Sequence, residues 1–264
     1  MTDWVATCRA AVVDVRGVLA DLPTRVEREP VVGHGEGGDD TTAVDAEVER
    51  VIVERFEREL TDYTLVSEEL GEARRGSGLP WLVLDPIDGS LNAKRGLPYF
   101  CLSLAVAEGP TMGDVVFGYL YDFGFGEEWT ARRGEGAWLN GEPLGAVRPK
   151  DEIEILAFEA TLTSSIAERA ANVVGLAYRL RVMGSLALSL CNLAAGRIDG
   201  VCSLKPARSV DIAAAQLLVR EVGLAIDLFE RPPFEESPLD LGAHSRVVAA
   251  ATPELCAQLA AALS

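Results

Sequence analysis

Apolar residues recur at helical spacing in two segments near the start of this 264-residue chain. In the segment at about 3–20, Trp4, Cys8, Val12 and Val15 fall mainly on one face of a helix. The segment at about 43–60 has an apolar stripe of its own, made of Val44, Val48, Val51, Ile52 and Phe56. Both segments predict helices that bury one face, and the Gly-rich acidic stretch 33–40 between them predicts a loop.

Short apolar runs follow these helices and predict a group of β-strands. They lie at 64–67, 81–84, 100–107, 115–121 and 128–131. The stretch 134–141 predicts a strand and a tight turn, since Asn140-Gly141 is a strong hairpin signal.

Beyond about residue 145 strands and helices alternate instead. Strands are expected at 153–158, 177–182, 198–202, 225–227 and 247–250, and helices at 164–174, 185–195, 211–222 and 253–263. The chain therefore predicts an α+β first half, 1–142, joined without a flexible linker to an α/β second half, 143–264.

Composition excludes several classes of protein. Apolar content of 48% with 25% charged residues is typical of a soluble globular protein, and no apolar run approaches a membrane span. A net charge of −17 disfavours nucleic acid as a partner. Five scattered cysteines and the lack of a signal peptide indicate a reducing cytoplasm without disulfides or a zinc site.

The most informative stretch is 82–90, where an apolar run is followed by two closely spaced carboxylates. Asp85 follows the run, Pro86 is expected to end the strand and stiffen a turn, and Asp88 comes next, before Gly89 and Ser90. Because ligands bind beyond the carboxyl ends of strands in α/β proteins, both acids should lie at an active-site edge. Hard oxygen ligands beside a Gly-Ser turn suit hydrated Mg²⁺ that shares its shell with a phosphate.

Three further acidic positions each have an ordinary structural explanation. Glu68 and Glu69 end a strand, where at most one would point into a given cleft, and a solvated turn would explain both. Asp211 opens a helix of small residues, and Asp45 lies at the start of another helix; an ordinary helix cap would explain each. Their occurrence together with Asp85 and Asp88 favours a shared site.

These motifs together resemble the inositol monophosphatase superfamily over essentially the whole chain. Its signature is Asp-Pro-Ile/Leu-Asp-Gly-Thr/Ser, preceded by a strand ending in Glu-Glu and followed downstream by Asp before Ala-Ala. The Gly-Ser-Leu-Asn run 89–92, the Gly-Leu-Pro-Tyr-Phe run 96–100 and the segment 205–213 are most similar to the archaeal-type fructose-1,6-bisphosphatase/inositol-1-phosphatase group. Dedicated inositol phosphatases usually have Trp at the position of Val210 and Glu at that of Ser203, and His34 lies near the place of a missing family lysine.

The resemblance implies a site with two or three Mg²⁺ ions. Their ligands would be Glu68, Asp85, Asp88, Asp211 and the carbonyl of Ile87. It also implies that Glu68 activates the attacking water, with Ser90 hydrogen-bonded to Asp45 behind it. Substrate would contact Asp88, Gly89, Ser90, Arg181, Gly184, Ser185, Leu186 and Lys205. A surface ion pair would explain Arg181 equally well, and a helix-start glycine would explain Gly184.

The resemblance implies a layered αβαβα sandwich as the fold. The partners that it implies are a small phosphorylated sugar or polyol and a second copy of the chain. The expected reaction is Mg²⁺-dependent hydrolysis of fructose 1,6-bisphosphate or inositol 1-phosphate by direct in-line attack of water. An adenosine 3′,5′-bisphosphate phosphatase and a non-catalytic sugar-phosphate sensor are the alternatives. A haloacid dehalogenase is disfavoured, because that class needs Asp-x-Asp and this chain has Asp-x-x-Asp.

Overall fold

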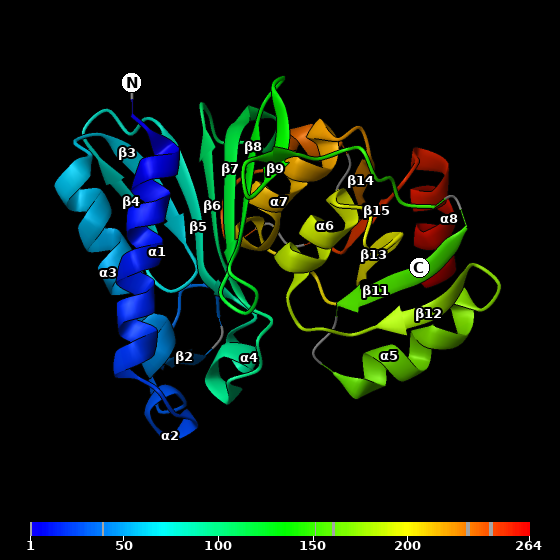
Figure 1. Cartoon of the computed structure of the whole chain (residues 1–264), viewed down its shortest axis with the longest axis horizontal. Helices are drawn as coiled ribbons and strands as arrows, with labels where there is room; N and C mark the ends of the chain where they lie inside the picture. The colour runs from blue at the N-terminus through cyan, green and yellow to red at the C-terminus, as the bar shows by residue number, and fades with distance from the viewer. Residues whose placement is uncertain (1, 39, 151, 160–161, 231–232, 243–244) are drawn as a thin grey trace.

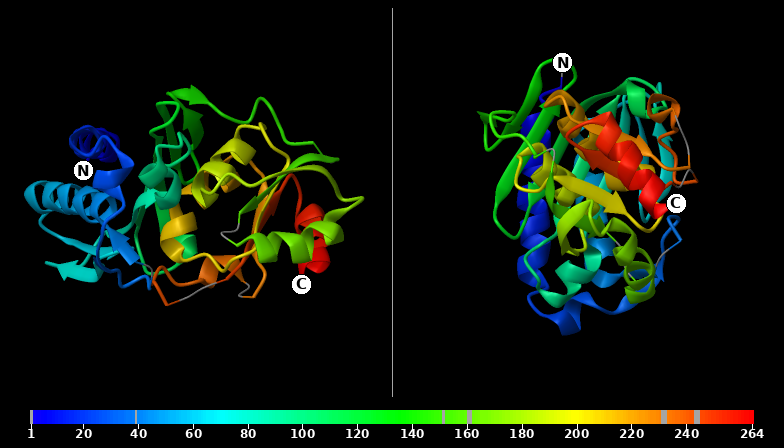
Figure 2. Two further views of the ribbon diagram at one scale, coloured as in Figure 1. Left: turned by 90° about the horizontal axis from the view of Figure 1, so that it is seen from below. Right: turned by 90° about the vertical axis from the view of Figure 1, so that its right-hand side faces the viewer.

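Five layers of secondary structure stack along the long axis of the molecule (Figure 1). The computed structural model describes residues 2–38, 40–150, 152–159, 162–230, 233–242 and 245–264. Helices, an eight-stranded sheet, helices, a five-stranded sheet and helices follow one another, which confirms the expected αβαβα sandwich. The two ends of the chain lie at opposite ends of this stack in Figure 1 and in the left view of Figure 2.

The first layer consists of α1 (Trp4–Asp21) and α3 (Ala43–Glu59), which pack on each other and bury their predicted apolar stripes. Between them run α2 (Arg25–Arg28), β1 (Val31–His34) and β2 (Asp40–Thr42). The strands β1 and β2 pair antiparallel, so the ends of the predicted loop 33–40 belong to a small hairpin instead.

The second layer is the eight-stranded sheet, in which β3 and β5 pair parallel and the other neighbours pair antiparallel. Its order is β10-β9-β8-β7-β6-β5-β3-β4. The strands are β3 (Tyr63–Ser67), β4 (Gly71–Arg75), β5 (Trp81–Asp88), β6 (Cys101–Ala107), β7 (Val115–Asp122), β8 (Glu127–Arg132), β9 (Gly136–Leu139) and β10 (Glu142–Pro143). Asn140 and Gly141 take φ values of 52° and 83° between β9 and β10, which confirms the hairpin turn. The short helices α4 (Ser90–Arg95) and η1 (Met112–Asp114) connect strands of this sheet.

The fourth layer is the five-stranded sheet, with the order β12-β11-β13-β15-β14. Its strands are β11 (Ile153–Glu159), β12 (Ala177–Arg181), β13 (Gly200–Ser203), β14 (Ala225–Leu228) and β15 (Val247–Ala250). β11 is parallel to β12 and β13, as expected of an α/β half, while β15 is antiparallel to both of its neighbours. On the outer side lie α5 (Thr163–Ala170), η2 (Ala171–Val173) and α8 (Pro253–Leu263); η3 (Phe234–Glu236) lies in the connection before β15.

The middle layer holds the two halves together. It consists of α6 (Leu186–Ala194) and α7 (Ser209–Glu221), both of which belong to the second half of the chain, and α7 packs on β5, β6 and β7 of the first sheet. A Cβ added to Gly118 of β7 would lie 2.6 Å from the carbonyl oxygen of Ala214, so a glycine is needed where α7 approaches. The predicted boundary at 142/143 falls within β10 (Glu142–Pro143), the edge strand of the first sheet, and stays a prediction as a domain boundary.

Two expectations from composition can be compared with the structure. All five cysteines are buried and free. Among the described residues, no helix is long and apolar enough to cross a membrane.

The close contact at Gly118 predicts opposite effects for two glycine substitutions. Gly118→Ala should lower the free energy of unfolding by about 1–3 kcal/mol, because backbone must move to admit the methyl group. The matched control Gly17→Ala, in α1, meets nothing within 4 Å and should raise it by about 0.5–1 kcal/mol. Urea unfolding measures both; a Gly118→Ala protein as stable as the wild type would contradict this account of the interface.

Candidate active site

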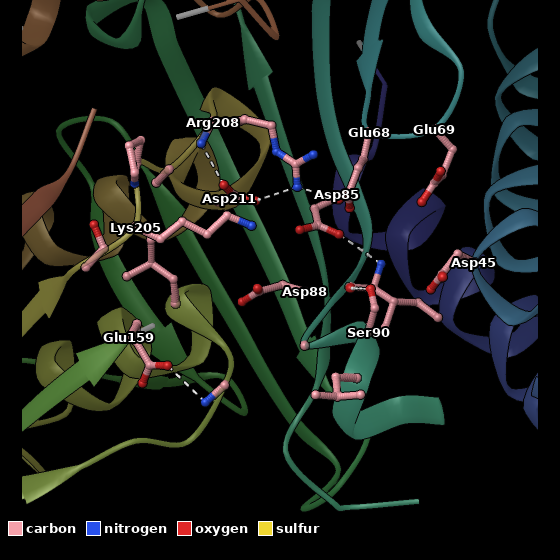
Figure 3. A pocket seen from close by; sticks show the side chains of 18 of the residues that line it. Asp45, Glu68, Glu69, Asp85, Asp88, Ser90, Glu159, Lys205, Arg208 and Asp211 are labelled. Atoms are coloured by element: carbon pink, nitrogen blue, oxygen red, sulfur yellow. Dashed lines mark hydrogen bonds and ion pairs between the residues drawn. The ribbon is translucent and has the colours of Figure 1, made fainter. Parts of the chain in front are cut away.

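A cavity of about 470 Å³ opens where the carboxyl end of β5 faces the second half of the chain (Figure 3). Acidic side chains dominate its lining: Asp40, Asp45, Glu68, Glu69, Asp85, Asp88, Glu159 and Asp211. Three cationic side chains, Lys94, Lys205 and Arg208, also line it in the described part of the chain. The cavity therefore gathers the acidic positions that the sequence singled out, which come from both halves.

The strand β5 does not end at Pro86 as predicted but continues through a bulge to Asp88. Asp85 lies opposite Ser103 of β6 and Asp88 opposite Cys101, so two residues of β5 face one of β6. A bulge tolerates Pro86 because the ladder is already interrupted there. The amide of Ile87 donates to Oδ1 of Asp85 at 3.0 Å and fixes that buried carboxylate within the turn.

Asp88 is held by the beginning of α6. The Ser185 hydroxyl and the Ala187 amide both donate to its Oδ2, at 2.5 and 2.7 Å. Burial raises the pKa of Asp88 to about 7, although these hydrogen bonds act in the opposite direction. Ser185 itself is only 1% exposed and does not line the cavity. In this structure the side chain of Ser185 positions Asp88, and a contact between Ser185 and substrate stays a prediction.

The side chain of Arg208 contacts both Glu68 and Asp211 and so links them. The guanidinium of Arg208 forms an ion pair with Glu68 and lies 3.5 Å from Oδ1 of Asp211. The Arg208 amide donates to Oδ2 of Asp211 at 2.6 Å, so Asp211 stabilises the first turn of α7 but is not its N-cap. Burial raises the pKa of Glu68 to about 7 in spite of the guanidinium. A role for Arg208 was not predicted.

Glu68 and Glu69 both line the cavity, which corrects the expectation that at most one of them would. They lie in the turn after β3, where strand alternation no longer applies. Buried Glu49 of α3 holds this turn by accepting from the amides of Glu69 and Leu70, at 3.3 and 3.2 Å, and from the Ser67 hydroxyl. Glu49 was missed, although it follows Asp45 by four residues on the buried face of the same helix.

The expected hydrogen bond between Ser90 and Asp45 is not formed. The Ser90 hydroxyl donates to the carbonyl of Ile87 at 2.9 Å, three residues back along its own turn. Asp45 accepts from the amide and hydroxyl of Thr42, and its Oδ2 lies 3.6 Å from Nζ of Lys94. Its buried Oδ1 has no hydrogen-bond partner. Lys94 thus takes the place beside Asp45 that was predicted for Ser90.

The predicted substrate residues divide between the cavity and the surface. Gly89, Gly184, Leu186 and Lys205 line the cavity. Arg181 does not: it is exposed, its Nη1 donates to the Leu180 carbonyl at 2.9 Å, and it lines a separate cavity of about 650 Å³. The structure therefore does not bring Arg181 to the acidic site.

The chemistry of the acidic set fits a hard divalent cation. Burial raises the pKa of Asp85 as well, and the neighbouring charge of Glu68 adds to the effect. Among the described residues, no group of three or more His, Cys, Asp or Glu side chains already forms a metal-ligand cluster. Instead, the carboxylates of Glu68 and Asp211 contact the guanidinium of Arg208, and Asp88 accepts a hydrogen bond at the start of α6. All of these groups are oxygen donors of the kind that Mg²⁺ prefers.

Comparison with known proteins places this chain in a family. A model described as the inositol monophosphatase family matches residues 5–264. The fructose-1,6-bisphosphatase/inositol-1-monophosphatase of Thermococcus kodakarensis is 34% identical over 225 residues, which are 85% of this chain and 83% of the relative. The Nus factor SuhB of Escherichia coli is 36% identical over 195 residues, or 70% of each chain.

A solved structure has the same fold. It is described as an inositol monophosphatase-fructose 1,6-bisphosphatase and superposes with a TM-score of 0.86. The superposition covers 99% of this chain and all of the other chain, at 24% identity. This likeness confirms the fold.

The raised carboxyl pKa values predict how metal and pH together change stability. Without metal, the folded protein binds more protons than the unfolded chain between about pH 4.5 and about pH 7, so its free energy of unfolding should fall as pH rises through that range. Mg²⁺ requires the ionised carboxylates, so it should raise the melting temperature more at pH 8 than at pH 5.5. Thermal unfolding in chelator and in Mg²⁺ measures this. The same Mg²⁺ effect at both pH values would contradict it.

Proposed function

This chain belongs to the inositol monophosphatase family of metal-dependent phosphomonoesterases, and on that premise we propose that it hydrolyses fructose 1,6-bisphosphate, inositol 1-phosphate or both. The observation that carries the proposal is the convergence of Glu68, Asp85, Asp88 and Asp211 on one cavity. A buried cluster of carboxylates is costly for a fold to maintain unless it binds a cation.

We propose that these four carboxylates and the carbonyl of Ile87 hold Mg²⁺. The Ile87 carbonyl accepts one hydrogen bond from Ser90 and has a second lone pair for this purpose. When bound, Mg²⁺ would stabilise charge on the phosphoryl oxygens and make the attacking water more acidic. Glu68 would orient that water and accept its proton.

The turn at Gly89 supports a place for the phosphate. Gly89 has φ of +93°, and an added Cβ would lie 2.9 Å from the Tyr99 carbonyl oxygen and 3.2 Å from that of Gly184. Only glycine fits there, and it precedes the first turn of α4. We propose that the amides of Gly89 and Ser90 bind the phosphate, and that the water attacks in line with the leaving oxygen.

The remaining lining supports a sugar or polyol as the leaving group. Lys205 lines the cavity and is our candidate for a contact with a second phosphate or with sugar hydroxyls. The relatives named fructose-1,6-bisphosphatase/inositol-1-monophosphatase favour these two substrates. As the family resemblance implies, the enzyme would act as a homodimer in the cytoplasm.

A second candidate comes from the relatives named Nus factor SuhB. The 36% identity over 195 residues with the Escherichia coli relative favours an additional role as a Nus factor, exercised through a partner molecule. A net charge of −17 disfavours direct contact with RNA, so such a partner would be a protein. Phosphatase activity remains the first proposal, since the acidic cavity supports it directly.

Phosphate release from the purified protein tests the proposal. We expect release from fructose 1,6-bisphosphate, inositol 1-phosphate or both in Mg²⁺, and none after a chelator removes the metal. Release from neither, or release unaffected by the chelator, would refute the proposed function. Binding of either ester without turnover would identify a sensor instead.

The design includes one matched pair of variants. Asp88→Asn should lower kcat at least ~100-fold while the melting temperature stays near that of the wild type, because a proposed metal ligand is removed without loss of volume. The exposed Asp21→Asn, at the end of α1, should leave kcat unchanged. Near-full activity in Asp88→Asn would show that the ligand assignment is wrong.

A further inference from the structure

Glu159 is a buried carboxylate in the cavity that the proposed chemistry does not use. It ends β11, is only 6% exposed, and pairs in register with Ser203 of β13. Figure 3 shows it across Asp88 from Ser90 and Asp45, on the side formed by the second half of the chain. With the phosphate at the Gly89 turn, this is the side that remains for the alcohol part of a substrate.

The carboxylate of Glu159 is fixed by two neutral donors. The Gly184 amide donates to its Oε2 at 2.9 Å, and the Ser189 hydroxyl donates to its Oε1 at 2.6 Å. The segment that carries Gly184 is held in turn by Asn92, whose Nδ2 donates to the Met183 carbonyl at 2.7 Å. These contacts set the position of the carboxylate before any ligand binds.

Glu159 retains capacity for further hydrogen bonds. An ionised carboxylate has about four lone-pair sites, and the two neutral donors use two of them. Burial raises the pKa of Glu159 to about 7, although hydrogen bonds from Ser189, Gly184 and the Met183 backbone act in the opposite direction. Hydroxyl groups of a ligand in the cavity would supply the missing donors.

We propose that Glu159 accepts hydrogen bonds from hydroxyl groups of the substrate alcohol and thereby selects polyol and sugar phosphates over esters without hydroxyls. This inference rests on the proposed function. A site built to hydrogen-bond a hydroxyl discriminates against an analogue that lacks it, because its own polar group is then left buried and unpaired.

The test compares esters with and without hydroxyls in Glu159→Gln, which keeps the volume and removes the charge. We expect kcat/KM for inositol 1-phosphate or fructose 1,6-bisphosphate to fall about 10–100-fold, mainly through KM. The value for 4-nitrophenyl phosphate should change less than about 3-fold, since that ester offers no hydroxyl donor. Glu154→Gln is the matched control on the same strand; Glu154 is ion-paired with Lys150 at the surface, and its loss should alter neither value.

The outcomes separate this inference from the proposed function. Equal losses for both kinds of ester would mean that Glu159 only supports the fold of the site, and unchanged values for both would mean that it does not contact substrate; either result overturns the inference alone. Absence of turnover in the wild type would overturn the proposed function and this inference with it. If Glu159→Gln does not fold, Glu159→Asp, which keeps the charge but shortens its reach, must lower the selectivity for hydroxyl-bearing esters in the same direction.

Discussion

The packing of α7 between the two sheets determines where the chemically active groups of this protein lie. Small residues bury this helix against β5, β6 and β7, and Gly118 allows the approach to Ala214. The packing brings Arg208 and Asp211 from the second half of the chain beside Glu68 from the first. The neighbouring helix α6 likewise brings Ser185 from the second half of the chain beside Asp88 from the first. The acidic cavity therefore depends on the association of the two halves.

That association concentrates negative charge in a buried place. The pKa values of Glu68 and Asp88 rise to about 7 because burial disfavours the charged forms. Arg208 offsets part of this cost, and the carboxylates of Asp211 and Glu68 raise the pKa of its guanidinium above the usual range despite burial. A cation that binds the ionised carboxylates would remove most of the remaining repulsion, which links the electrostatics of the fold to its chemistry.

Local patterns were enough to predict the features that depend on neighbours in sequence. The amphipathic helices, the Asn140-Gly141 turn and the two acids near the carboxyl end of β5 all follow from spacing and turn chemistry. The exposed edge strand β4 (Gly71–Arg75) was missed because it has no apolar alternation. Ser185, Arg181 and Glu159 needed the tertiary structure, because nothing in their local sequence says which side chain or cavity they face. The direction of the Ser90 hydroxyl depends on a single rotamer, which no pattern specifies.

The central claim is that carboxylates from both halves form one metal site. Crystals grown with Mn²⁺ in place of Mg²⁺ test it most directly, since the anomalous scattering of manganese shows where the metal binds. We expect peaks within bonding distance of Asp85 and Asp88, with Glu68 and Asp211 turned from Arg208 toward the metal. A fully occupied manganese site elsewhere, with these four carboxylates still bound only to protein donors, would contradict the account.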